Sequence, residues 1–173
     1  PYIYNVRQAK SQSPIVVVGF GPAGMFAALT LAQGGAKVIV LERGECVEER
    51  ARSVERFRNG GELNVNSNVQ FGEGGAGTFS DGKLTTGTKD MRIQRVFREL
   101  VRHGAPAEIL TDAMPHIGTD KLTEVVRNIR KEIISLGGEI HFSTRFCGYE
   151  THNGRLSAVC AECGGQQLHI DTS

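Results

Sequence analysis

The feature that most constrains this chain is a glycine-rich turn between a buried strand and a helix. Residues 19–24 read Gly-Phe-Gly-Pro-Ala-Gly, a G-x-G-x-x-G pattern. The run at 15–19 is apolar and β-branched, which is typical of a strand covered on both faces in a parallel sheet. Small and apolar residues follow at helical spacing over 22–33, and a second strand is predicted at 37–42. This order predicts a βαβ unit with a right-handed crossover.

Each residue type in the turn has a physical reason to be there. Gly19 permits the tight turn, Gly21 lets the main chain approach a pyrophosphate, and Gly24 lets the helix pack closely on the strand. Pro22 falls near the first helical position, where its missing N–H costs little. The N–H groups at this helix start, beside Ala23, point toward phosphates. The turn is therefore predicted to bind the pyrophosphate of a dinucleotide.

An acidic residue ends the second predicted strand. Glu42 stands at the spacing from the glycines at which a carboxylate accepts both ribose hydroxyls of an adenosine and repels a 2′-phosphate. This predicts a site for FAD or NAD rather than NADP, in an α/β, three-layer Rossmann-type domain. The alternative is a glycine turn and a solvated carboxylate without a ligand. Spacing alone leaves FAD and NAD open.

The rest of the chain alternates between periodic and irregular segments. An amphipathic helix is predicted over 47–58, but the stretch at 59–89 has many Gly, Asn, Ser and Thr and is too long for an idle connector. Two further helices are predicted, one capped by Asp90 and ending near residue 103, the other capped by Thr119 or Asp120 and ending at the Gly-Gly pair at 137–138.

The C-terminal segment predicts a β-meander. Residues 139–144 alternate as in a strand, and two or three short strands follow, with turns at the Asn-Gly pair 153–154 and the Gly-Gly pair 164–165. A complete domain of this kind adds a further sheet strand and a late Gly-Asp segment, which the sequence after Gln166 does not supply. Because the chain also begins at Pro1 rather than Met, we expect it to be part of a longer protein, with its dinucleotide domain incomplete at the C-terminus.

Bulk composition excludes some partners. The 20 basic and 19 acidic residues leave a formal net charge of +1, which gives no global field to attract nucleic acid or an anionic membrane. No run approaches the roughly 18 apolar residues that cross a bilayer, and no signal pattern opens the chain. The 4 cysteines do not form the framework of a secreted domain. We expect a cytoplasmic protein without a membrane partner.

A resemblance favours FAD at the predicted site. The Pro-Ala of G-x-G-P-A-G and the sequence Leu41-Glu42-Arg43-Gly44 resemble the N-terminal FAD site of the flavoprotein superfamily that includes glutathione-reductase-like, fumarate-reductase-like and aromatic-hydroxylase-like enzymes. The resemblance implies FAD as the cofactor, with Arg43 next to Glu42, whose carboxylate accepts the ribose hydroxyls. The disulfide-reductase subclass is rejected, because it needs a close cysteine pair and Cys46 stands alone.

A second glycine-rich segment, at 72–84, reads GEGGAGTFSDGKL. This composition is typical of a main chain that lies against a flat or anionic ligand, and the alternative is a flexible surface loop. It is not a Walker phosphate loop, because Leu84 follows Lys83 where Ser or Thr is required.

The strings at 68–84 and 115–122 resemble a family of bacterial FAD-dependent dehydrogenases, described as NAD(FAD)-utilising dehydrogenases, over about residues 14–151. The resemblance implies an N-terminal extension at 1–13, a partial FAD-binding domain at 14–173, and an inserted substrate domain to which 59–120 contribute. By analogy with the superfamily, the residues expected near the flavin are Gly75, Ala76, Gly77 and Thr78. Those expected near the adenine are Thr144, Arg145 and Phe146.

Flavin carries redox chemistry itself, so few catalytic side chains are required. His116 is a candidate for proton transfer, and Lys83 for interaction with negative charge on a reduced flavin; a structural or solvated role is the alternative for each. The expected partners are FAD, a small-molecule substrate and NAD(P)H as electron donor. No metal is expected, because the C-x-x-C at 160–163 is more simply two unrelated thiols than half of a zinc site.

The sequence thus predicts an FAD-dependent oxidoreductase, with two rivals. The first is an enzyme that uses NAD at the same site. The second is a non-enzymatic flavin-binding sensing or assembly module that contacts RNA through four arginines at helical spacing: Arg92, Arg95, Arg98 and Arg102. A solvated helix face explains those arginines more simply, and no aromatic residues interleave with them.

Overall fold

The computed structural model describes residues 5–79, 82–84, 88–112 and 115–172. Within them the strands are β1 (Ile15–Val18), β2 (Val38–Leu41), β3 (Glu139–His141), β4 (Thr144–His152), β5 (Arg155–Cys163) and β6 (Gln166–Asp171). The helices are α1 (Pro22–Gln33), α2 (Val47–Arg58), α3 (Ile93–Arg102) and α4 (Thr119–Ser135), with short 3₁₀ helices η1 (Ala76–Phe79) and η2 (Ala107–Leu110). Residues 1–4 of the predicted extension and 80–81 of the glycine-rich segment lie outside the described residues.

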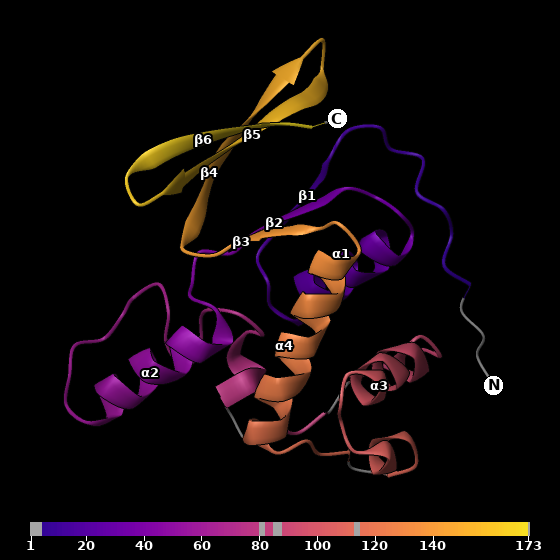
Figure 1. The fold of residues 1–173 in the computed structure, drawn as a ribbon, viewed down its shortest axis with the longest axis vertical. Coiled ribbons are helices and arrows are strands. Elements are labelled where there is room, and N and C mark those ends of the chain that lie inside the picture. The colour runs from indigo at the N-terminus through magenta and orange to yellow at the C-terminus, as the bar shows by residue number, and fades with distance from the viewer. Residues whose placement is uncertain (1–4, 80–81, 85–87, 113–114, 173) are drawn as a thin grey trace.

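The elements form three layers (Figure 1). In the described residues β1, β2 and β3 make a parallel sheet in that order, and β4, β5 and β6 make an antiparallel meander. The meander lies on one side of the parallel sheet, and α1 and α4 lie on the other. This confirms the predicted α/β, three-layer Rossmann-type fold with a parallel sheet and a β-meander.

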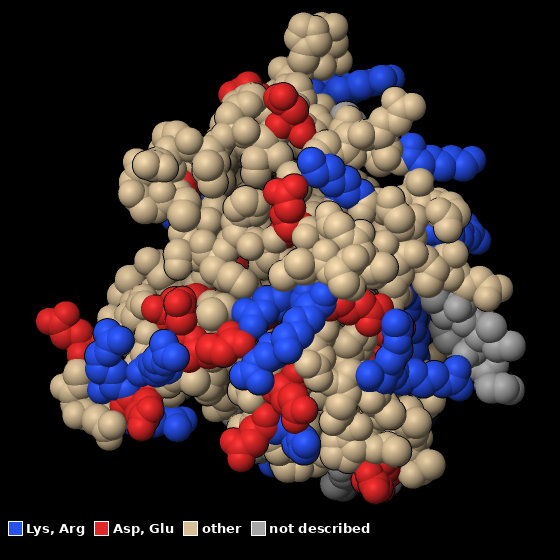
Figure 2. All heavy atoms as spheres, in the orientation of Figure 1, with Lys and Arg blue, Asp and Glu red and all other residues tan. Residues whose placement is uncertain are grey.

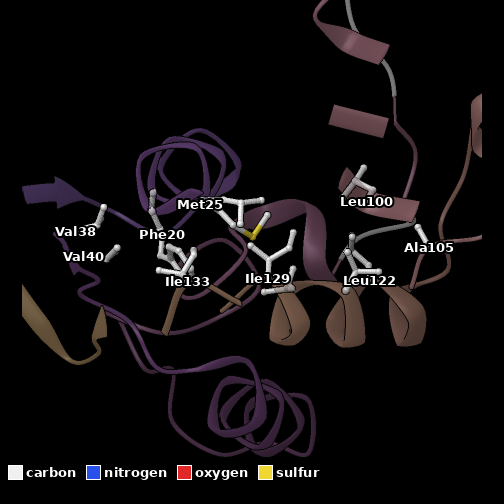
Figure 3. Packing of buried hydrophobic residues seen from close by; sticks show 14 of the residues in the cluster. Phe20, Met25, Val38, Val40, Leu100, Ala105, Leu122, Ile129 and Ile133 are labelled. Carbon is white, nitrogen blue, oxygen red and sulfur yellow. The ribbon is translucent and has the colours of Figure 1, made fainter. Parts of the chain in front are cut away.

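Strand β2 lies at the centre because both of its faces are covered. All four of its residues are buried. Since successive side chains point to opposite faces, Val38 and Val40 join the core under α1 and α4, whereas Ile39 and Leu41 pack with Val159 of the meander. Figure 3 shows the helix-side core, which includes the labelled side chains of Phe20, Met25, Ile129 and Ile133.

One predicted strand is divided in two. Residues 139–144 do not form one strand, because β3 ends at His141 and Ser143 adopts a positive φ of 50°. The main-chain N–H of Ser143 donates to the main-chain carbonyl of Gly44 at 2.9 Å, and that of Thr144 donates to the main-chain carbonyl of Glu42 at 2.9 Å. These bonds anchor the corner at which the chain leaves the parallel sheet and enters the meander.

Two predicted helix caps are wrong. The N-cap of α4 is Gly118, without a side-chain cap bond, rather than Thr119 or Asp120. Helix α3 starts at Ile93 after Arg92, so Asp90 is not its cap. Asp90 instead accepts the main-chain N–H of Arg92 at 2.8 Å and the Arg92 guanidinium, in a turn that precedes the helix. None of the helices in the described ranges is long and apolar enough to cross a membrane.

Candidate functional site

A cavity of about 500 Å³ opens at the carboxyl ends of β1 and β2. This is the edge at which open α/β sheets bind their ligands. Its walls come from the two strand ends, the glycine turn, the glycine-rich segment and the start of β4. The lining residues are Val18, Gly19, Gly21, Leu41, Glu42, Arg43, Gln70, Phe71, Gly72, Gly75, Thr144, Arg145 and Phe146.

The glycine turn has the geometry that its sequence predicts. Gly19 adopts a φ of +88°, in the left-handed region that favours glycine. A Cβ on Gly24 would collide with the carbonyl oxygen of Gly19, so only glycine permits this approach of α1 to β1. Gly21 is the N-cap of α1, and Pro22 is the first residue of the helix. The turn therefore presents a bare main chain and a helix start to the cavity.

Glu42 is held in a fixed orientation at the cavity wall. Its side chain is buried, with 7% of the residue exposed. One carboxylate oxygen accepts the main-chain N–H of Phe20 at 2.6 Å, and the other accepts that of Gly44 at 2.7 Å. Each oxygen keeps a second lone pair. The carboxylate is thus oriented by the protein and can still accept hydroxyl donors from a ligand.

The glycine-rich segment packs directly on the glycine turn. The main-chain N–H of Gly74 donates to the carbonyl of Phe20 at 2.8 Å. A Cβ on Gly75 would lie 3.0 Å from Cδ of Pro22 and 3.4 Å from Cα of Gly21. Two segments that are about 50 residues apart in the sequence therefore approach closely, and a side chain at Gly75 would be crowded by the ring of Pro22.

A second pair of glycines meets on the other side of the cavity. A Cβ on Gly44 would collide with Cα of Gly72, and one on Gly72 would lie 2.6 Å from Cδ of Arg50. Gly72 also has a φ of +115°. The loop after β2 and the glycine-rich segment are thus joined without intervening side chains.

Five lining residues were not among the predicted cofactor contacts: Val18 and Leu41 at the strand ends, and Gln70, Phe71 and Gly72. The last three form one wall of the cavity, and the Arg43 guanidinium carbon lies 5.2 Å from the centre of the Phe71 ring. Gln70 and Phe71 directly precede the predicted ligand loop, and Gly72 is the first residue of that loop. Side-chain type alone could not place them at the cavity.

Several predicted site residues lie outside the cavity lining. Pro22, Ala23 and Gly24 stand behind the turn in α1. Of the four residues predicted near the flavin, Gly75 lines the cavity, whereas Ala76 and Gly77 are exposed and Thr78 is buried. The three residues predicted near the adenine, at 144–146, all line it.

The two candidate catalytic residues are neighbours. Lys83 and His116 form an isolated antiparallel bridge, flanked by main-chain bonds from Leu84 to Pro115 at 3.0 Å and from Ile117 to Gly82 at 2.9 Å. Both residues are exposed, and neither lines the cavity. No pattern in the sequence indicated that segments 33 residues apart would pair here.

A buried ionic cluster lies behind the glycine-rich segment. Glu73 is fully buried, and one of its oxygens accepts the main-chain N–H of Val47 at 2.7 Å and the Arg130 guanidinium at 3.1 Å. Burial raises the pKa of Glu73 to about 7, against the opposing effects of Val47 and Arg130. Burial also acts to raise the pKa of Glu48, but bonds from Arg130 and Arg127 prevail and lower it to about 2.

The arginines of α3 have intramolecular partners. Arg95 donates to Thr30 at 3.1 Å and to Gln33 at 3.3 Å, and Arg102 pairs with Glu132 at 2.9 Å. On the face shown in Figure 2, basic and acidic side chains lie intermixed over the helices. The predicted stripe thus contributes to contacts of α3 with α1 and α4.

The cysteines and the acidic residues form no metal centre within the described part of the chain. All four cysteines are free thiols. No group of three His, Cys, Asp or Glu side chains in the described residues is arranged to hold a metal ion.

The fold and the cavity together define a nucleotide-cofactor-binding domain of the Rossmann type. Residues 13–139 match the family described as pyridine nucleotide-disulphide oxidoreductase, and the chain belongs to that family. Family membership and fold indicate FAD or a related nucleotide as the cofactor. The sequence nevertheless holds Cys46 without a second cysteine nearby.

Known relatives share the sequence or the fold. An uncharacterized protein of Clostridium beijerinckii is 57% identical over 144 residues, which are 83% of this chain and 27% of that protein. The fold resembles that of a 3-ketosteroid-delta4-(5alpha)-dehydrogenase from Rhodococcus jostii RHA1, with a TM-score of 0.58 and 16% identity over 98% of this chain and 47% of the other.

The myxobacterial chondrochloren halogenase CndH, an FAD-dependent halogenase, has a TM-score of 0.54 and 13% identity over 92% of this chain and 35% of its own. Likeness at this level of identity shows the fold. The chain spans about a quarter of the length of the Clostridium relative and less than half of each of these two enzymes.

Proposed function

We propose that the protein is an FAD-dependent oxidoreductase and that the cavity at the ends of β1 and β2 binds the ADP part of FAD. One observation carries the proposal. The oriented, buried carboxylate of Glu42 lies on the wall of the same cavity as the bare main chain of Gly19 and Gly21. A carboxylate that accepts ribose hydroxyls beside a glycine turn that accepts a pyrophosphate is the arrangement that an adenosine diphosphate requires.

The residues present fit this group. The approach of Gly24 to Gly19 sets the start of α1 directly behind the turn, where its N–H groups stabilise phosphate charge. Residues 144–146 would hold the adenine, with Arg43 beside the ribose, and Gly75 with residues 76–78 would lie toward the flavin. When bound, the flavin supplies the electron-transfer chemistry, and the chain supplies binding and orientation.

The finer assignment rests on the resemblance. We propose that the parent protein is a bacterial NAD(FAD)-utilising dehydrogenase, that residues 1–13 are an extension, and that 59–120 contribute to a substrate domain inserted in a domain at 14–173. Its substrate would be a small molecule, with NAD(P)H as the electron donor. Lys83 and His116 remain the candidates for interaction with flavin charge and for proton transfer, because their bridge joins two irregular segments of that span.

Cofactor identification tests the proposal directly. We expect the purified protein to release FAD on denaturation, identified by mass, and the native protein to show flavin absorption bands near roughly 370 and 450 nm. A Glu42→Ala variant should lose this flavin, whereas Glu62→Ala, at an exposed carboxylate, should retain it. Recovery of NAD in place of FAD would overturn the choice of cofactor, and retention of FAD by Glu42→Ala would overturn the site.

A further inference from the structure

A buried arginine lies behind the cavity wall that Gln70, Phe71 and Gly72 form. Arg50, on α2, has none of its surface exposed, although charged side chains are almost never fully buried unless they are paired. Its Nε donates to the carbonyl of Asn68 at 2.8 Å. Its Nη1 donates to the carbonyls of Gly72 at 3.3 Å and of Glu73 at 2.6 Å. One guanidinium therefore holds both ends of the segment 68–73.

This segment supplies one wall of the cavity. Gln70, Phe71 and Gly72 line the cavity, whereas Arg50 does not. The Asn68 side chain accepts the main-chain N–H groups of Gln70 at 2.9 Å and of Phe71 at 3.3 Å. The carbonyl that Arg50 binds thus belongs to the residue that shapes the turn at the wall.

The remaining surroundings of Arg50 are also adapted to its charge. Its guanidinium carbon lies 4.6 Å from the centre of the Phe79 ring, in cation–π contact. Nη2 is buried and has no hydrogen-bond acceptor among the described residues, so this ring contact compensates part of its desolvation. Burial lowers the pKa of Arg50 to about 10, against the opposing charges of Glu42 and Glu73, so the side chain stays cationic at neutral pH.

Ordinary loop packing does not account for this arrangement. A buried cation is costly, and an apolar side chain of similar size could fill the same space. The planar fork of a guanidinium can donate to several carbonyls in fixed directions, which an apolar side chain cannot do. Arg50 thus bonds directly to the segment 68–73, and its charge also interacts with that of Glu42, which lines the cavity as well.

We propose that Arg50 is a positioning residue for the cofactor: it fixes the segment 68–73 so that the cavity is shaped for the dinucleotide before the dinucleotide binds. This inference rests on the proposed function, because it assigns Arg50 to the same site. It predicts that removal of the guanidinium weakens FAD binding through the wall, without removal of any group that touches FAD.

The test compares Arg50→Met with Arg52→Met, a matched change two residues away on the exposed side of α2. Two properties are measured: amide hydrogen exchange of residues 68–75 without cofactor, and the Kd for FAD from quenching of flavin fluorescence. We expect Arg50→Met to exchange these amides faster and to bind FAD about tenfold or more weakly, since charged hydrogen bonds are lost. Arg52→Met should match the unmodified protein in both.

Chemical rescue separates positioning from general stability. In Arg50→Ala, guanidinium ion at sub-denaturing concentration should occupy the vacated space and recover part of the FAD affinity, whereas equal sodium chloride should not. If circular dichroism shows that Arg50→Met does not fold, the FAD affinity of Arg50→Lys tests the proposal in its place. Lysine keeps the charge but lacks the fork, so weaker FAD binding by a folded Arg50→Lys supports the proposal.

Unchanged exchange at 68–75 and unchanged FAD affinity in folded Arg50→Met, or in Arg50→Lys where that variant decides, would overturn it. Failure of the proposed function gives a different result. In that case the unmodified protein binds no FAD, while the exchange at 68–75 still reports whether Arg50 holds the wall.

Discussion

The carboxylate of Glu42, at the end of β2, accepts the main-chain N–H of Phe20 at 2.6 Å, so the second strand closes the turn that follows the first. The same side chain also accepts the N–H of Gly44 at 2.7 Å. Glu42 therefore has two functions in the proposed site. It completes the fold of two loops, and it presents its remaining lone pairs to the ribose.

Removal of the Glu42 carboxylate should lower both stability and affinity. In Glu42→Ala two buried N–H groups lose their acceptor, which we expect to lower the free energy of unfolding by about 2–4 kcal/mol. Glu42→Gln keeps an acceptor oxygen and should lose less. Urea unfolding of the two variants, with Glu62→Ala as the exposed control, checks the order. Equal stability of Glu42→Ala and Glu62→Ala would contradict it.

A methyl group at Gly24 should disrupt the turn. Because a Cβ at this position collides with the carbonyl of Gly19, Gly24→Ala must displace α1 from β1. We expect a loss of about 2 kcal/mol or more in the free energy of unfolding, together with loss of FAD binding. The control is Gly148→Ala, where a Cβ meets nothing within 4 Å. A Gly24→Ala protein that binds FAD normally would argue against close packing as the reason for the third glycine.

The buried Glu73 should make stability fall as the pH rises. Burial raises its pKa from 4.5 to about 7, so between these values the folded state holds a proton that the unfolded state releases. Stability from this group is therefore complete below about pH 4.5 and is lost as the pH rises through about 7. The charges that face it are Arg50 and Glu48 on α2, Arg130 on α4 and Glu42 at the end of β2.

Thermal unfolding from pH 5 to 8 checks this prediction. Glu73→Gln cannot ionise and should therefore remove the part of the decline in Tm that Glu73 causes. Each kcal/mol that Glu73 contributes to the free energy of unfolding corresponds to about 2–4 °C in Tm. Glu62→Gln, an exposed carboxylate, should leave the profile unchanged. A Glu73→Gln profile that follows the unmodified protein at every pH would show that Glu73 is ionised throughout.

The Glu42 carboxylate should determine which nucleotides stabilise the protein most. FAD at 100 times its Kd should add about 2.7 kcal/mol, equivalent to a rise of about 5–10 °C in Tm. NADP should add less than NAD, because the carboxylate repels a 2′-phosphate. A thermal-shift series with the three nucleotides at equal concentration measures this order. An equal shift with NADP and NAD would contradict the ribose contact.

Phe71 allows a test of the wall itself. It is 46% exposed and lies beside Arg43, so its removal leaves the core intact. We expect Phe71→Ala to weaken FAD binding by about tenfold with little change in Tm, as loss of an aromatic contact predicts. Phe57→Ala, at a similarly exposed phenylalanine on α2 that does not line the cavity, is the control. Equal FAD affinity of the two variants would place the ligand away from this wall.

Local sequence predicted most of the fold because the relevant signals are short. The run at 37–42 indicated the strand β2, and Gly34 marked the end of α1 where the structure has it. The corner at Ser143 escaped prediction, because its cause is the hydrogen bonding of Ser143 to Gly44, almost a hundred residues away. The cap of α4 was predicted wrongly for a similar reason. Gly118 follows residues 116 and 117, which pair with residues 82 and 83, so the start of the helix depends on a contact that the helical pattern does not show.

The site divides in the same way. Gly19, Gly21 and Glu42 lie in one βαβ unit, so spacing could bring them together. Phe71 belongs to a segment with long-range contacts, namely the bond from Arg50 to the carbonyl of Gly72 and the close approach of Gly72 to Gly44. Such long-range contacts leave no periodic signal in a single sequence.

The close approach of Gly44 to Gly72 restricts how this sequence can diverge. An oversized side chain at most buried contacts can be offset by a smaller one opposite it. A side chain at Gly44 would meet Gly72, which is already a glycine, and nothing smaller exists. A selection for second-site suppressors of Gly44→Ala should therefore yield changes that move a whole loop, such as insertions near residues 59–66, and no suppressor at Gly72 itself.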